Sequence, residues 1–195
     1  MSIIILLDPS GSMSSMKNEP VEGVYTFIHE QKKNVVEGYA PKFSLYTFNS
    51  VTTPVFENKE LHQIPVLTIE KDGNVQEVLD ILYEPHGFTA IFDCIWDVLE
   101  KHQENDVELV IVTDGQDTSS TKEGKQVLEF LQKRQTEGWK VHYLMAKGNM
   151  FDQEIGNVSN VSQAYSPNEV GSFSRMMRIT SASISRHRTV KNPDN

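Results

Sequence analysis

Oxygen-bearing side chains are concentrated in a short segment near the start of the chain. Asp8, Ser10 and Ser12 alternate with a proline and a glycine, directly after the aliphatic run 3–7. In a loop that follows a strand, this alternation can turn three oxygens toward one point. Carboxylates and hydroxyls are hard ligands that suit Mg²⁺, Mn²⁺ or Ca²⁺ better than zinc or copper. The same residues could instead cap a helix that begins just downstream.

Two later segments carry groups of the same kind. Thr89 precedes an apolar helical pattern, and Asp114 follows the aliphatic run 107–112. Each has a simpler interpretation, since Thr89 could be a helix N-cap and Asp114 could begin a turn. Asp117 or Thr118 could likewise cap the next helix. Three such loops in this order favour one shared metal site over three unrelated caps.

Strand and helix patterns alternate along the chain, which predicts a mostly parallel sheet between two layers of helices. The polar loops would then lie at one edge of that sheet, where open α/β sheets bind ligands. Strands are expected at residues 3–7, 42–48, 51–56, 107–112 and 139–145. Helices are expected at 17–38, 89–101 and around 127–138, with short elements at 151–161 and a final helix from 169 onward.

The second and third of these strands are separated only by Asn49-Ser50, so they predict a hairpin with an antiparallel edge strand. The segment that follows, 57–85, has weaker patterns. A short helical pattern is formed there by Val75, Val78, Leu79 and Leu82.

Composition narrows the class of protein. The chain has 195 residues, 38% of them hydrophobic, and a formal net charge of −9. These values predict a single globular domain over 1–188, followed by a flexible tail at 189–195. The negative charge argues against nucleic-acid binding. A membrane span is not expected either, because no stretch approaches the roughly 20 apolar residues that one requires.

Cysteine usage and the start of the chain bear on its location. Cys94 is the only cysteine, which excludes an internal disulfide and argues against a cysteine-based zinc site. The first strand lacks the basic start and small-residue cleavage site of a signal peptide. These features predict a cytoplasmic location. Because Cys94 lies among apolar residues, we expect a buried, inert thiol.

Taken together, the three polar loops resemble those of the von Willebrand factor A-type (vWA) domain. That family has Asp-x-Ser-x-Ser after its first strand, a threonine in a middle loop and an aspartate after its fourth strand. Together they form its metal-ion-dependent adhesion site (MIDAS). Asp8, Ser10, Ser12, Thr89 and Asp114 match these positions. The surrounding Asp-x-Ser-Gly-Ser-Met, Thr-Ala-Ile-Phe-Asp and Val-Thr-Asp-Gly segments are typical of stand-alone intracellular members.

The resemblance implies a Rossmann-like three-layer α/β/α sandwich, the vWA fold, with a divalent cation held by those residues. Mg²⁺ is the expected ion, with Mn²⁺ or Ca²⁺ as alternatives. The resemblance further implies that Ser10, Ser12 and Thr89 bind directly, whereas Asp8 and Asp114 act partly through water. A Glu or Asp of a protein partner would complete the coordination. The implied function is therefore metal-dependent protein binding without catalysis.

The middle loop departs from the family pattern. Many members have Gly-Gly-Thr where this chain has Gly87-Phe88-Thr89. We interpret Phe88 as a core-facing aromatic residue; the alternative is a residue on the rim of the metal site that contacts a partner. His86 is interpreted as a solvated loop histidine and not as a metal ligand.

Two other functions remain open. A Mg²⁺-dependent phosphohydrolase also begins its motif with an aspartate after the first strand, but it needs a second carboxylate where this chain has Ser10. A metal-independent structural subunit would use other surfaces. One candidate is the basic C-terminal region, which we interpret as helix-terminal cations followed by a frayed end. Its basic residues are Arg175, Arg178, Arg186, His187, Arg188 and Lys191.

Overall fold

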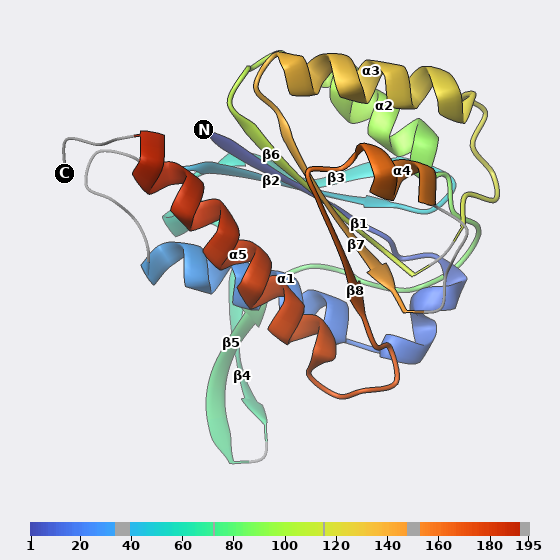
Figure 1. Ribbon diagram of the computed structural model, residues 1–195. Helices are drawn as coiled ribbons and strands as arrows, with labels where there is room; N and C mark the ends of the chain where they lie inside the picture. Colours follow the sequence, from blue (N-terminus) through green and yellow to red (C-terminus); the bar gives the residue numbers. More distant parts are fainter. Residues whose placement is uncertain (34–39, 72, 115, 148–152, 192–195) are drawn as a thin grey trace.

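The computed structural model describes residues 1–33, 40–71, 73–114, 116–147 and 153–191. A six-stranded sheet lies at the centre, in the order β3-β2-β1-β6-β7-β8 (Figure 1). All neighbouring strands are parallel except β2 and β3, which form the predicted antiparallel edge. The strands are β1 Ser2–Leu7, β2 Lys42–Phe48, β3 Thr52–Lys59, β6 Val107–Thr113, β7 Lys140–Ala146 and β8 Val161–Tyr165.

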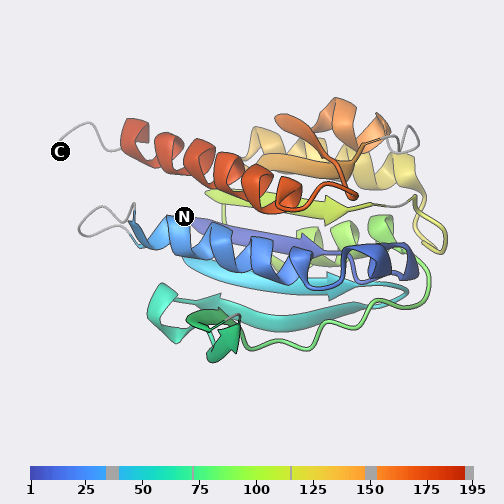
Figure 2. The ribbon, with the colours of Figure 1, turned by 90° about the horizontal axis from the view of Figure 1, so that it is seen from below.

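Helices cover both faces of this sheet (Figures 1 and 2). One face packs on α1 (Glu19–Lys33) and α5 (Ser172–Lys191). The other face packs on α2 (Ile91–Lys101), α3 (Gly124–Thr136) and the short α4 (Gln153–Val158). Alternate residues of β1 and β6 enter the two hydrophobic cores, which is why most residues of both strands are aliphatic. The predicted three-layer α/β/α architecture is confirmed.

The helices α1 and α5 lie side by side across the sheet (Figure 2). Gly23 of α1 faces the ring of Phe173, and a Cβ atom at this position would overlap that ring. Farther along, Gln31 Nε2 donates to the carbonyl and the hydroxyl of Ser181 at 2.8 and 2.7 Å. The two helices are therefore joined by close packing near one end and by buried hydrogen bonds near the other.

The segment expected to carry a short helix forms a hairpin instead. Strands β4 (Val66–Lys71) and β5 (Asn74–Leu79) pair antiparallel, apart from the main sheet. Gly73 lies in the turn with φ of +74°, a conformation that glycine adopts without strain. The helical spacing was misleading because Val75 is exposed, whereas Leu79 is buried against the main core. The hairpin projects from the sheet beside α1 (Figure 1).

Several predicted boundaries shift. Helix α1 was expected over 17–38; it begins at Glu19 and its described part ends at Lys33, whereas 34–39 lie outside the described residues. Helix α5 begins at Ser172 and continues to Lys191, so it includes part of the segment expected as a tail; 192–195 lie outside the described residues. Within the described part of the chain, no helix combines the length and the apolarity that a membrane span requires.

Candidate metal centre

Asp8 follows the last residue of β1, at the carboxyl edge of the sheet. Its backbone N–H donates to the carbonyl of Val112 on the neighbouring strand at 3.0 Å. The side chain is fully buried. Its Oδ1 accepts the backbone N–H of Ser10 at 2.6 Å, and its Oδ2 accepts the hydroxyl of Thr113 at 2.6 Å. Both carboxylate oxygens are thus held in fixed positions.

The first and third loops meet through three oxygen-bearing side chains. Ser10 Oγ lies 3.1 Å from Ser12 Oγ. Ser12 Oγ in turn donates to Asp114 Oδ1 at 2.6 Å, although the two residues are far apart in the sequence. This contact exists because β1 and β6 are neighbours in parallel register, with Leu7 opposite Val112. The predicted meeting of these loops at one edge is confirmed.

The middle loop, which contains Thr89, is bonded to the first loop. The N–H of His86 donates to the carbonyl of Pro9 at 2.8 Å, and the N–H of Gly11 donates to the carbonyl of Gly87 at 3.1 Å. A Cβ atom on Gly11 would lie 3.4 Å from that same carbonyl oxygen, which is an ordinary van der Waals contact. Thr89 itself is almost completely buried.

The middle loop is also bonded to the third loop. The N–H of Thr89 donates to Thr118 Oγ1 at 2.9 Å, and the N–H of Thr118 donates back to the carbonyl of Thr89 at 2.8 Å. The N–H of Ile91 donates to Asp117 Oδ1 at 3.0 Å, and the N–H of Phe92 donates to Ser120 Oγ at 3.1 Å. These bonds satisfy the first N–H groups of α2.

The capping interpretations are therefore wrong. Ser10 stands at the N-cap position of a short 3₁₀ helix, Gly11–Met16, but its side chain makes no capping hydrogen bond. The N-cap of α2 is Ala90 and not Thr89. Asp117 accepts the N–H of the first residue of α2, and Thr118 bonds to Thr89 just before that helix. The hydroxyls of the first loop are consequently not used for helix capping.

Electrostatics at this edge favour a cation. Burial raises the pKa of Asp8 to about 6, against the lowering effect of its hydrogen bonds from Thr113 and Ser10. Burial also raises the pKa of Asp114. Neither carboxylate forms an ion pair with a Lys, Arg or His side chain within the part of the chain that is described. An all-oxygen donor set with two such carboxylates fits a hard divalent cation.

Two tyrosines donate hydrogen bonds to backbone carbonyls next to the metal-site loops. Tyr83 donates its hydroxyl to the carbonyl of Asp8 at 2.9 Å, and Tyr165 donates to the carbonyl of Thr113 at 3.2 Å. Burial raises the pKa of both hydroxyls, so both remain protonated donors. Neither residue was predicted, because an isolated tyrosine in a weakly patterned segment gives no sequence signal for this role.

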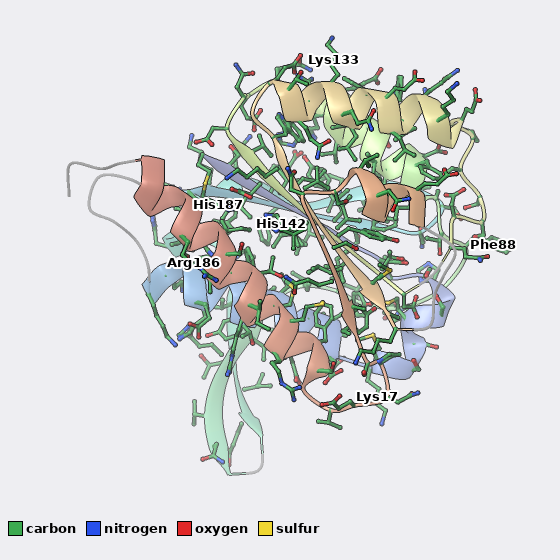
Figure 3. All side chains as sticks on the ribbon, in the orientation of Figure 1. Lys17, Phe88, Lys133, His142, Arg186 and His187 are labelled. Carbon is green, nitrogen blue, oxygen red and sulfur yellow. The ribbon has the colours of Figure 1, made fainter. Side chains whose placement is uncertain are left out.

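Phe88 lies on the surface beside the site, with 67% of its side chain exposed (Figure 3). The prediction that it faces the core is wrong. His86 is exposed and bonded within its own region, as expected of a loop histidine: its Nδ1 lies 2.6 Å from the carbonyl of Glu84. Nearby is a groove of about 500 Å³. The groove is lined by Pro9, Thr47, Asn49, Val51, Thr53, Val55, Leu82, Glu84 and His86.

Comparison with known proteins was made on sequence and on structure. No protein-family model and no curated protein matches the sequence. A solved von Willebrand factor type A protein from Catenulispora acidiphila matches with a TM-score of 0.62 at 11% identity, over 93% of this chain and 42% of that one. Proximal thread matrix protein 1 from the mussel byssus matches with a TM-score of 0.65 at 16% identity. The match covers 94% of this chain and 45% of the mussel chain.

A further structure of the mussel protein, described as having a zinc-occupied MIDAS motif, matches with a TM-score of 0.59 at 15% identity, over 92% and 45%. This chain spans less than half the length of each of these solved chains. Identities this low establish the architecture and not the activity. The chain has the fold of von Willebrand factor A-type domains, in agreement with the resemblance carried by its motifs.

Proposed function

We propose that this protein is a non-catalytic module that binds another protein through a divalent cation. Asp8, Ser10, Ser12, Thr89 and Asp114 would hold the ion, with Mg²⁺ expected first and Mn²⁺ or Ca²⁺ as alternatives. The observation that carries this proposal is the contact of Ser12 with Asp114 and Ser10, which joins two loops distant in sequence. A neighbour in the structural comparison with a zinc-occupied MIDAS motif supports it further.

The buried carboxylate of Asp8 gives a physical reason for a cation. An ionised carboxylate inside a protein is costly unless it is paired. By resemblance, Ser10, Ser12 and Thr89 are expected to contact the ion, and the two aspartates to act partly through water. When bound, the ion would supply a coordination position for a carboxylate oxygen of a partner. The partner is therefore expected to present a Glu or Asp at this edge of the sheet.

Exposed apolar residues beside the loops would provide selectivity. Phe88, Leu82 and Val51 are at least two-thirds exposed, and the last two line the adjacent groove. Exposed aromatic and aliphatic residues next to a polar centre are typical of protein-binding sites. We expect the acidic residue of the partner to be flanked by an apolar side chain. A buried, unreactive Cys94 is consistent with the proposed intracellular location.

Catalysis is the less favoured alternative. Ser10 stands where a phosphohydrolase of this topology would need its second carboxylate, and a serine hydroxyl is not a comparable general acid at neutral pH. Phosphatase turnover that requires Mg²⁺ and is abolished by Asp8→Asn would establish the enzyme. A metal-independent structural subunit is the other alternative, and it predicts that binding ignores both Mg²⁺ and Asp8.

A capture experiment tests the proposed function. Immobilised protein would be exposed to host extract with Mg²⁺ or with EDTA, using the native chain, Asp8→Ala and the matched surface control Asp80→Ala. We expect one set of partners that is retained by the native chain and the control only in Mg²⁺, and displaced by glutamate-containing peptides. Partners retained equally by Asp8→Ala, or in EDTA, would contradict metal-bridged binding.

A further inference from the structure

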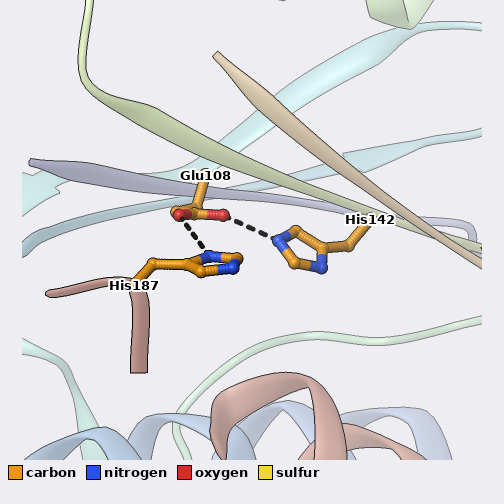
Figure 4. Close-up of side chains that lie close together, drawn as sticks. All are labelled: Glu108, His142 and His187. Carbon is orange, nitrogen blue, oxygen red and sulfur yellow. Dashed lines mark hydrogen bonds and ion pairs between the residues drawn. The ribbon is translucent and has the colours of Figure 1, made fainter. Parts of the chain in front are cut away.

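Three potential metal-binding side chains lie together at the opposite edge of the sheet. Glu108 and His142 stand near the starts of β6 and β7, and His187 lies near the end of α5 (Figures 3 and 4). Asp114, which follows β6, lies six residue steps after Glu108, which corresponds to about 20 Å of strand. This cluster is thus well separated from the MIDAS-type centre and shares no residue with it.

The geometry brings one carboxylate against two imidazoles (Figure 4). Glu108 Oε2 lies 2.7 Å from His142 Nε2, and Glu108 Oε1 lies 3.2 Å from His187 Nδ1. One ligand atom from each residue can be chosen such that all lie within 4.8 Å of one another. Ligands about 2.0 Å from a tetrahedral zinc ion are roughly 3.3 Å apart, so small side-chain movements would suffice for coordination.

Burying a carboxylate and an imidazole in the protein interior costs folding free energy. Glu108 is 4% exposed and His142 is fully buried, in strands whose residues are mostly apolar. His142 Nδ1 has no hydrogen-bond partner among the described residues, so the ring is held by Glu108 through one nitrogen only. An imidazole with a single hydrogen bond can exchange it for a metal bond without losing another one. Buried polar atoms without partners are uncommon in native proteins and point to function.

We propose that Glu108, His142 and His187 form a second metal site, selective for Zn²⁺ over Mg²⁺. Two imidazoles and one carboxylate are ligands that suit zinc, in contrast to the all-oxygen set at the other edge. The partly exposed His187 provides an entry path and leaves a fourth position for water. Lys140 Nζ, 3.9 Å from Glu108 Oε1, is also partly exposed and can move into solvent when the ion binds.

Zinc at this position would join β6, β7 and the C-terminal part of α5. The sequence does not indicate this second site, because its three residues are distant from one another along the chain. His187 also lies among the basic residues of the C-terminal region. The expected consequence is that Zn²⁺ raises the melting temperature of the protein. Because ligands must be deprotonated to bind the ion, zinc affinity should fall in acid.

Zinc titration of a chain without its MIDAS-type centre tests the proposal. In the full-length Asp8→Ala background, calorimetry at neutral pH should detect one Zn²⁺ per chain, not displaced by millimolar Mg²⁺. Adding His142→Ala or His187→Gln should weaken affinity by at least about 100-fold, the upper end of the effect of removing a residue that only supports a ligand. Adding His62→Ala, at an exposed histidine that pairs with Glu60 and does not belong to the cluster, should leave affinity unchanged.

The partly exposed His187→Gln variant guards against unfolding, which circular dichroism would monitor. The proposal is supported if this variant loses both its zinc affinity and the zinc-induced rise in melting temperature while it keeps its helical circular dichroism signal. Two results would overturn the proposal: no zinc binding by the Asp8→Ala chain, or equal binding after His142→Ala and His187→Gln. In either case the cluster would be a structural ion pair that holds α5 on the sheet.

Discussion

Asp8 carries its carboxylate into the protein interior, and no cationic side chain among the described residues pairs with it. Because burial raises its pKa to about 6, the ionised form at pH 7.5 costs folding free energy in metal-free protein. In EDTA, the Asp8→Asn variant should therefore have a melting temperature no lower than that of the native protein. Its free energy of unfolding should be higher by up to about 3 kcal/mol. Thermal unfolding followed by circular dichroism measures this.

When metal is added, the native protein should instead have a higher melting temperature than the Asp8→Asn variant. Millimolar Mg²⁺ should raise the melting temperature of the native chain, because an ion that binds only the folded state stabilises it. Asp8→Asn should not respond. An Asn variant that is strongly destabilised in EDTA, or that Mg²⁺ stabilises as well as native, would contradict the role given to this carboxylate.

Phe88 offers a second test at the level of one residue. Its side chain is largely exposed, so Phe88→Ala should change the free energy of unfolding by no more than about 0.5 kcal/mol. Mg²⁺ affinity should be retained, whereas capture of partners should decrease. Urea unfolding with calorimetry checks the first two expectations. A loss of 3 kcal/mol or more would instead indicate a core position.

The residues of the proposed metal site could be selected from the sequence because their chemistry is local to each motif, and their role as ligands stays a prediction. Asp8, Ser10 and Ser12 show their spacing directly, and Asp114 follows an evident strand. The capping interpretations were wrong because the bonds that satisfy α2 come from Asp117 and Ser120, which are distant in sequence. The roles of Tyr83 and Tyr165 depend in the same way on contacts that only the folded chain makes.

At the level of elements, Gly23 allows α1 to approach α5. Gly→Ala inside a helix ordinarily stabilises it by about 1 kcal/mol. Gly23→Ala should instead destabilise the protein by about 1–3 kcal/mol, because the added methyl group would overlap the ring of Phe173. Urea unfolding distinguishes the two signs directly. A stabilised variant would mean that the two helices do not pack as closely as described.

Asp117 connects the third loop to the start of α2. Asp117→Ala should lower stability by about 1 kcal/mol, as is usual for loss of a carboxylate that accepts a helix N-terminal N–H group. Because Thr89 lies on the loop before α2, Mg²⁺ affinity should also fall, although Asp117 is not among the proposed ligands. Unchanged affinity in a destabilised variant would show that the loop is positioned without this bond.

The main strands and helices were predictable because each has a long, distinct pattern. Residues 3–7 are aliphatic throughout, and residues 107–112 are aliphatic except for Glu108, as expected of strands buried on both faces. The hairpin β4–β5 was missed because four apolar residues in a short segment match a helix as well as a strand. The Asp72-Gly73 pair in the sequence, which is typical of hairpin turns, was the signal that favoured the hairpin.

At the scale of the whole molecule, two different clusters of polar side chains lie at opposite edges of the sheet. Its carboxyl edge gathers hydroxyls and carboxylates from three loops, and its opposite edge gathers two imidazoles and a carboxylate from two strands and α5. The fold is shared with von Willebrand factor A-type structures at 11% and 16% identity, because buried strands and loop order determine it more than individual surface residues do. The identity of the partner does not follow from the fold, because recognition depends on the particular side chains exposed around the site.

Calorimetric titration of Mg²⁺ and Mn²⁺ tests the central claim most directly. Native protein should bind one ion per chain at the carboxyl edge, and Ser10→Ala with Ser12→Ala should abolish this binding. The matched control is Ser14→Ala with Ser15→Ala, at two exposed serines of the same 3₁₀ helix, and it should bind like native. No binding by the native chain at millimolar ion, or equal binding by both double variants, would contradict the metal centre.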